Sequence, residues 1–156
     1  ATRACSACWS LSEPAVNVDL PDLNVWLALS WPLHPQHLRA RHYWETEAGE
    51  RVVFCSATGL GLVRLLCRRS VMGEGVLTPA AAGDVLERFC EQPGVGFGGE
   101  PTDGWEVFQA LLRKGTVDAE HCTDTHLAAL SIVNGWRLVS FDPEFERYAG
   151  LKLLKL

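Results

Sequence analysis

Residues 123–142 read TDTHLAALSIVNGWRLVSFD and form the clearest helix-and-strand unit of this sequence. Thr123 or Asp124 can begin a helix whose apolar residues recur at helical spacing, and Gly135 stands where a left-handed residue ends many helices. The apolar run Arg137–Phe141 that follows predicts a buried strand. A helix that leads directly into a buried strand is the building block of α/β folds, so this stretch indicates the fold class.

Short apolar strands and longer helical patterns alternate in the rest of the chain as well. Strands are expected at residues 16–22, 51–54, 95–97 and 151–154, and helices at residues 23–30, 35–47, 56–69, 79–93, 105–112 and 143–148. This alternation predicts a mainly parallel sheet with helices on both faces, a three-layer α/β/α sandwich. The domain is expected over residues 16–156. Residues 1–15 have no clean period and are expected to be an N-terminal tail or edge extension.

The length and composition predict one globular domain and exclude several classes of protein. The 156 residues are 47% apolar and 21% charged, which rules out disordered, collagen-like and coiled-coil chains. No run reaches the roughly 18 apolar residues of a membrane span, so no membrane association is expected. With 14 basic and 19 acidic residues the net charge is −5, which does not fit nucleic-acid binding through bulk positive charge. The six cysteines, without a hydrophobic leader, favour reduced thiols in a cytoplasmic protein.

Three aspartates fall at places that one parallel sheet would bring together. Asp22 ends the first expected strand, Asp142 ends a late strand, and Asp124 opens the helix before that late strand. Ligands of such sheets bind beyond the carboxyl ends of the strands, and carboxylates that meet there repel one another unless a cation lies between them. Mg²⁺ prefers such oxygen ligands and activates water for phosphate hydrolysis. Each aspartate taken alone is more simply interpreted as a helix cap or turn residue.

Five motifs in this order resemble those of PIN-domain ribonucleases and, among them, the VapC toxins of type II toxin–antitoxin pairs. The motifs are DLNVWLAL at residues 22–29, HPQH at 34–37, CSATGLGLVRLL at 55–66, TDTHLAAL at 123–130 and VSFDPEF at 139–145. The resemblance extends from about Val18 to Leu154. It implies a PIN-like fold and cleavage of RNA phosphodiester bonds that depends on Mg²⁺ or Mn²⁺. It also implies a small cognate antitoxin as partner and a homodimer.

The resemblance implies roles for particular residues. Asp22, Asp124 and Asp142 match the family's acidic positions, which makes them the expected catalytic residues and metal ligands. Asn24 and Thr123 match the polar positions beside them, and we expect both to orient the carboxylates and contact the substrate.

One position departs from the family pattern. The family's glutamate on the second-motif helix falls at Gly59, which cannot bind a metal and weakens a helix by roughly 1 kcal/mol relative to alanine. An alternative function is therefore a PIN-fold module that binds RNA or antitoxin with weakened catalysis. Glu144 is a candidate to compensate, although an exposed surface glutamate is the simpler interpretation. A phosphohydrolase with Asp22 as nucleophile is a more distant alternative, because Asn24 replaces the second acid of its motif.

The densest basic cluster consists of Arg64, Arg68 and Arg69. Arg64 and Arg68 are four residues apart, which predicts that they share one helical face. Guanidinium groups on that face could hold RNA phosphates. A solvated face, or salt bridges to the antitoxin, is an equally good interpretation.

The six tryptophans are unusually many for a chain of this length. Trp44, Trp105 and Trp136 lie among apolar neighbours and are expected in the core. Trp26 and Trp31, near the first helix, are expected at a dimer or partner interface, where tryptophan is enriched.

Overall fold

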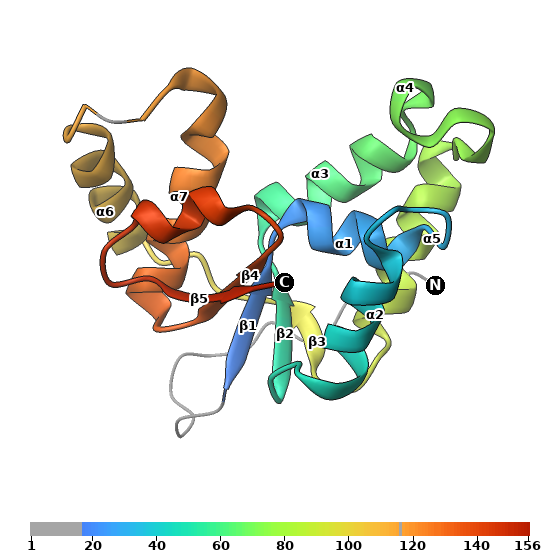
Figure 1. Ribbon diagram of the computed structural model, residues 1–156, viewed down its shortest axis with the longest axis horizontal. Coiled ribbons are helices and arrows are strands. Elements are labelled where there is room, and N and C mark those ends of the chain that lie inside the picture. Colours follow the sequence, from blue (N-terminus) through green and yellow to red (C-terminus); the bar gives the residue numbers. More distant parts are fainter. Residues whose placement is uncertain (1–16, 116) are drawn as a thin grey trace.

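The computed structural model describes residues 17–115 and 117–156, whose strands form one sheet in the order β3-β2-β1-β4-β5 (Figure 1). The strands are β1 (Val18–Pro21), β2 (Arg51–Phe54), β3 (Val95–Phe97), β4 (Arg137–Ser140) and β5 (Lys152–Lys155). Every pair is parallel, as expected from the alternation in the sequence. The N-terminal tail expected over residues 1–15 lies outside the described residues.

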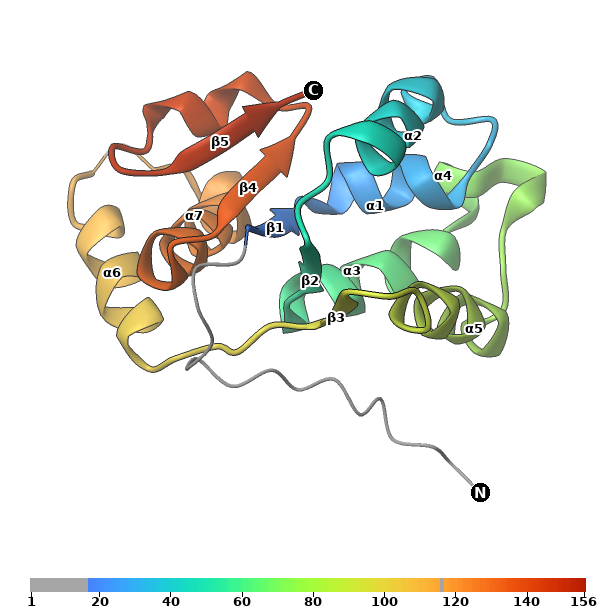
Figure 2. The same ribbon diagram turned by 90° about the horizontal axis from the view of Figure 1, so that it is seen from below.

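Helices cover both faces of the sheet (Figure 2). They are α1 (Leu23–Ser30), α2 (His37–Thr46), α3 (Ser56–Leu66), α4 (Arg69–Met72), α5 (Pro79–Cys90), α6 (Asp103–Leu112) and α7 (Cys122–Asn134), with short 3₁₀ turns η1 (Gly73–Gly75), η2 (Ala119–His121) and η3 (Pro143–Arg147). Within the described ranges, none of these helices is both long and apolar enough to cross a membrane.

The core is divided between the two faces by the alternation of side chains along the strands. Val53 and Leu138 face the cluster formed with α6 and α7, while Val52 and Phe54 face the cluster formed with α1, α3 and α5. Because successive residues of a strand point to opposite faces, adjacent apolar residues of β2 serve both clusters. The three-layer α/β/α sandwich predicted from the sequence is therefore confirmed.

Several helix boundaries differ from those predicted. The second helix begins at His37 instead of Pro35, because the chain turns from Trp31 onward and the His37 ring bonds to the Ala28 carbonyl, with 2.7 Å between the atoms. The third helix ends at Leu66, where the Arg68 N–H bonds back to the Leu65 carbonyl. Arg68 consequently lies outside α3, and the predicted helical face shared with Arg64 is wrong.

Two tryptophans also lie where the sequence did not predict them. Trp26 is fully buried and stacks on Phe54 of β2 with 3.7 Å between ring centroids, so it belongs to the core and not to an interface. Trp105 on α6 is 55% exposed, although a core position was expected. The core position predicted for Trp136 is confirmed.

A buried ion pair joins the amino-terminal ends of two strands. The carboxylate of Asp19 in β1 has no exposed surface and accepts two hydrogen bonds of 2.8 Å from Arg137 in β4. It also accepts bonds from the Tyr43 hydroxyl of α2 at 2.8 Å and from the Gly49 N–H at 2.9 Å. One side chain thus fixes α2 against β1 and β4, at the sheet edge opposite to Asp22.

Candidate active site

The carboxyl edge of the sheet brings the three predicted aspartates together. Asp22 directly follows β1 and caps α1, and its N–H bonds to the Val139 carbonyl of β4 at 2.8 Å. Asp142 lies two residues beyond β4, and Asp124 lies in the first turn of α7. In Figure 1 the start of α1, η3 and α7 surround this edge. The charges of Asp124 and Asp142 both act on Asp22, so the three side chains share one electrostatic site.

Ser140, the last residue of β4, links these groups by hydrogen bonds. Its hydroxyl donates to Oδ2 of Asp22 at 2.9 Å, and it accepts the Asp142 N–H at 3.0 Å and the Asn24 amide at 3.3 Å. The serine therefore orients Asp22 and fixes the backbone that carries Asp142. The sequence analysis assigned no role to Ser140, although its place two residues before Asp142 in the same motif was a usable signal.

Capping a helix and belonging to the acidic site are not exclusive roles here. Asp22 caps α1 by accepting the Leu23 N–H on Oδ1 at 2.6 Å, and Asp142 caps η3 by accepting the Glu144 N–H on Oδ1 at 2.8 Å. Each cap uses one oxygen and leaves further lone pairs. Asp124 is partly buried and accepts no hydrogen bond from the residues that the structure describes, so no hydrogen bond competes with a ligand for its oxygens.

Without a bound ligand, the surroundings of Asp22 and Asp124 disfavour the ionised form of both carboxyl groups. Burial raises the pKa of Asp22 to about 6, and the charges of Asp124 and Asp142 add to this effect, while the Ser140 and Leu23 hydrogen bonds oppose it. Burial and Asp142 likewise raise the pKa of Asp124, offset in part by His121 and Arg147. A proton or a cation at this edge would relieve that cost.

The donor chemistry fits a hard divalent cation that keeps several waters. All available ligand atoms are oxygens, and the buried Oδ1 of Asn24 has no hydrogen-bond partner. Among the described residues, however, no three His, Cys, Asp or Glu side chains lie close enough together to hold one ion. Mg²⁺ typically uses one or two carboxylates and retains water, so the arrangement suits Mg²⁺ or Mn²⁺ better than a fully caged ion.

Glu144 forms a second cluster beside the aspartates. Its Oε2 lies 2.8 Å from Nε2 of His121, which precedes α7, and 2.8 Å from a guanidinium nitrogen of Arg147. The charges of all three side chains act on Asp124. Because two donors already hold this carboxylate, the geometry does not support Glu144 as a replacement for the family's missing glutamate.

Gly59 does not face the acidic site, which corrects the expectation from the sequence. A Cβ on Gly59 would lie 2.9 Å from the ring of Phe97, within the apolar cluster under α3 and α5. Gly61 instead faces α1, where a Cβ would lie 2.8 Å from the side chain of Leu23, the neighbour of Asp22. A glutamate side chain at position 59 would therefore begin against an apolar ring, so the geometry does not support Gly59 as an open ligand position.

The remaining predicted substrate contacts are at the surface. Thr123 is exposed beside Asp124 at the start of α7. Arg64 on α3 and Arg68 beyond its end are both exposed. Neither arginine forms an ion pair within the described part of the chain, so both guanidinium groups are available to an external anion.

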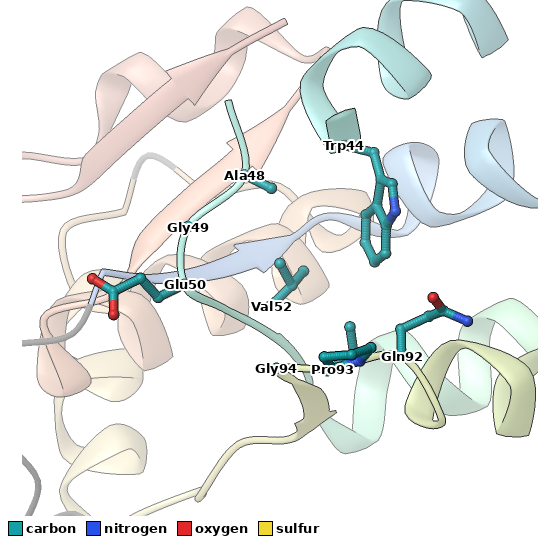
Figure 3. Close-up of a pocket in the computed structure, with 9 residues that line it drawn as sticks. Trp44, Ala48, Gly49, Glu50, Val52, Gln92, Pro93 and Gly94 are labelled. Atoms are coloured by element: carbon teal, nitrogen blue, oxygen red, sulfur yellow. The ribbon is translucent and has the colours of Figure 1, made fainter. Parts of the chain in front are cut away.

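A separate shallow pocket of about 240 Å³ lies at the opposite edge of the sheet, between the end of α2 and the turn before β3 (Figure 3). Trp44, Val52, Gln92 and Pro93 line it together with Glu50, whose carboxylate points away from Trp44. It contains no group of titratable side chains comparable with the carboxyl edge, so it is not the candidate active site.

Comparisons with known proteins identify relatives of the whole chain. No model of a known protein family matches the chain. Its sequence is 32% identical over 139 residues to Ribonuclease VapC41 of Mycobacterium tuberculosis, covering 86% of this chain and 95% of that protein. The structure resembles M. tuberculosis VapC20, a Sarcin-Ricin loop cleaving toxin, with a TM-score of 0.62 at 17% identity over 86% and 98% of the two chains. VapBC-5 of M. tuberculosis, a member of the VapBC family of toxin–antitoxin systems, gives a TM-score of 0.53 at 12% identity over 89% and 98%.

The alternative of a binding module with weakened catalysis finds no support in these observations. It depended on Gly59 as a vacant ligand position, and Gly59 faces Phe97. Ribonuclease VapC41, which aligns with 86% of this chain, is named a ribonuclease.

Proposed function

The chain belongs to the VapC family of PIN-domain ribonuclease toxins, and from this premise we propose that it is an endoribonuclease that needs Mg²⁺ or Mn²⁺ and uses Asp22, Asp124 and Asp142. The observation that carries the proposal is the meeting of three carboxylates at one sheet edge, where burial and mutual repulsion raise the pKa of Asp22 to about 6. A group this costly to ionise is unusual outside functional sites.

The residues of the site would divide the work between them. One or two of the three aspartates would bind the ion directly and the remainder through its waters, with Asn24 Oδ1 as a neighbouring acceptor for one of those waters. Ser140 would keep Oδ2 of Asp22 in place through its 2.9 Å hydrogen bond. A bound Mg²⁺ or Mn²⁺ supplies an activated water and stabilises the charge that develops on the phosphate. Thr123, Arg64 and Arg68 would contact the RNA, the arginines through phosphate oxygens.

The partners follow from the family. A small antitoxin is the proposed protein partner, since the relatives of this fold include members of VapBC toxin–antitoxin systems. RNA is the proposed substrate, because the matching relative is named a ribonuclease. A homodimer is proposed as the state of the toxin itself.

The test compares RNA cleavage by the wild-type chain and by Asp124→Asn over a titration of Mg²⁺. Asp124→Asn is expected to abolish cleavage and to leave the circular dichroism spectrum unchanged, because the carboxylate accepts no hydrogen bond that the fold needs. Asp84→Asn is the matched control, since Asp84 is exposed on α5 and undergoes the same chemical change. Cleavage by Asp124→Asn at the wild-type rate, or wild-type cleavage undiminished in EDTA, would contradict the proposal.

A further inference from the structure

We propose that His121 and Arg147 form a binding subsite for a backbone phosphate of the RNA, and that the carboxylate of Glu144 occupies this subsite in the free protein. The inference rests on the proposed function, because it assigns an RNA phosphate to residues beside the proposed catalytic edge. It adds a substrate-binding element that neither the motifs nor the comparisons identify.

The geometry of the cluster is that of an anion held between two donors. One oxygen, Oε2 of Glu144, lies 2.8 Å from Nε2 of His121 and accepts a hydrogen bond of 2.8 Å from a guanidinium nitrogen of Arg147. The donors come from separate segments, the turn before α7 and the end of η3. A phosphate oxygen presents the same acceptor chemistry to these donors, and guanidinium groups bind phosphate and carboxylate alike.

The backbone of His121 and the side chain of Arg147 have contacts that do not involve the glutamate side chain. The His121 carbonyl accepts the Thr125 hydroxyl at 2.8 Å, and that hydroxyl also lies 2.8 Å from the buried Tyr148 hydroxyl. The Arg147 guanidinium lies over the Tyr148 ring, 5.4 Å from its centroid. Loss of the carboxylate would therefore leave the backbone of His121 and the guanidinium group of Arg147 near their present positions.

Glu144 itself can leave without disturbing the aspartates. Its side chain is 50% exposed. Its backbone N–H, which bonds to Oδ1 of Asp142 at 2.8 Å, stays fixed when the side chain rotates toward solvent. The exchange of a carboxylate for a phosphate thus needs only side-chain rotation and keeps the cap of η3 intact.

The position of the cluster suits the substrate. His121, Glu144 and Arg147 all lie near enough to Asp124 for their charges to act on it. Replacing the glutamate by a phosphate would hold the RNA strand next to the edge where cleavage is proposed. In the free protein the carboxylate lies against both side chains, so an anion has to displace it in order to bind.

The experiment measures binding of a fluorescein-labelled single-stranded RNA by anisotropy in EDTA, where the proposed activity is off. Glu144→Gln is expected to bind about fivefold more tightly than wild type, because the competing carboxylate is gone. The slope of log affinity against log salt should steepen by about 0.7, the value for one added phosphate contact on a single strand. Arg147→Met should weaken binding about fivefold and remove the gain when combined with Glu144→Gln.

Glu146→Gln is the matched control. It removes the same charge from the same turn, but Glu146 pairs with Lys155 at 2.5 Å instead of with the proposed donors. If Glu144→Gln binds RNA no better than Glu146→Gln, the inference is overturned, and Glu144 is a structural bridge between η3 and α7. Arg147→Met tests the subsite separately, since an unchanged salt slope in that variant also overturns the inference.

If the wild-type chain cleaves RNA while these variants bind RNA as the wild type does, only this inference fails. If the wild-type chain neither binds nor cleaves RNA, the proposed function fails.

Discussion

At the scale of single residues, Asp22 is both the cap of α1 and a buried member of the acidic edge. One of its oxygens accepts the first N–H of α1 and the other accepts the Ser140 hydroxyl. The sequence predicted the position of Asp22 but not its raised pKa. That pKa depends on how the folded chain buries the carboxyl group and on Asp124, Ser140 and Asp142, which lie more than a hundred residues away in the sequence. Ser140 was missed for the same reason.

The raised pKa of Asp22 predicts a pH dependence of stability in EDTA. Between about pH 4 and 6 the folded chain holds a proton that the unfolded chain releases, so the free energy of unfolding should fall as pH rises through this window. A shift of about two pH units corresponds to about 3 kcal/mol. Chemical denaturation at several pH values should show a smaller fall for Asp22→Asn than for wild type. If the free energy of unfolding of the two proteins falls equally with pH, the raised pKa of Asp22 is contradicted.

Gly59 gives a prediction opposite to the one that its place in the motif suggests. Gly59→Glu would put a carboxylate against the Phe97 ring, in an apolar cluster without a partner, and should destabilise the fold by about 3 kcal/mol or more. The change should not strengthen Mg²⁺ binding. Leu60→Glu is the control, because the adjacent Leu60 is 72% exposed and should cost within about 0.5 kcal/mol. Urea denaturation measures both, and equal stability of the two variants would show that Gly59 does not face Phe97.

At the scale of elements, the sequence predicted the strands well because each is a short apolar run bounded by turn residues. The helix over residues 23–30 was predicted with its exact bounds, since Asp22 and Pro32 mark its ends. Helix ends without such marks were predicted less well. α3 ends at Leu66, where the chain turns back on the last residues of the helix, and α2 starts at His37, whose ring bonds to the Ala28 carbonyl of α1. Neither bond is marked by a helix-ending residue in the sequence.

The ion pair of Asp19 and Arg137 should stabilise the packing of β1, β4 and α2 against one another. Arg137→Met removes the guanidinium from a fully buried carboxylate and should lower the free energy of unfolding by about 3–5 kcal/mol. Arg41→Met is the control, because its pair with Glu45 on α2 is more than half exposed and should cost under about 1 kcal/mol. Adding Asp19→Asn to Arg137→Met should recover part of the loss. If Arg137→Met loses no more stability than Arg41→Met, the hydrogen bonds from Tyr43 and Gly49 are enough to stabilise the buried Asp19 carboxylate.

At the scale of the whole molecule, the apolar residues that stay exposed differ from those predicted for an interface. Trp26 is core, so it contributes nothing to a dimer face. Leu33 and Leu38, which flank the turn into α2, are 82% and 80% exposed instead. Which apolar residues remain outside depends on how the layers pack, and the hydrophobic pattern alone does not reveal it.

These two leucines carry the last prediction, on the oligomeric state. Leu33 and Leu38 lie five residues apart in the sequence and are both almost fully exposed. We expect them to belong to a surface that another chain covers, and in a solution of the purified toxin the other chain is a second copy. Light scattering should therefore give a dimer for wild type and a monomer for the double variant Leu33→Lys, Leu38→Lys. Leu60→Lys, on α3, should remain dimeric. A wild-type monomer would contradict the homodimer. A double variant that stays dimeric but no longer co-purifies with its antitoxin would instead assign the two leucines to the antitoxin interface.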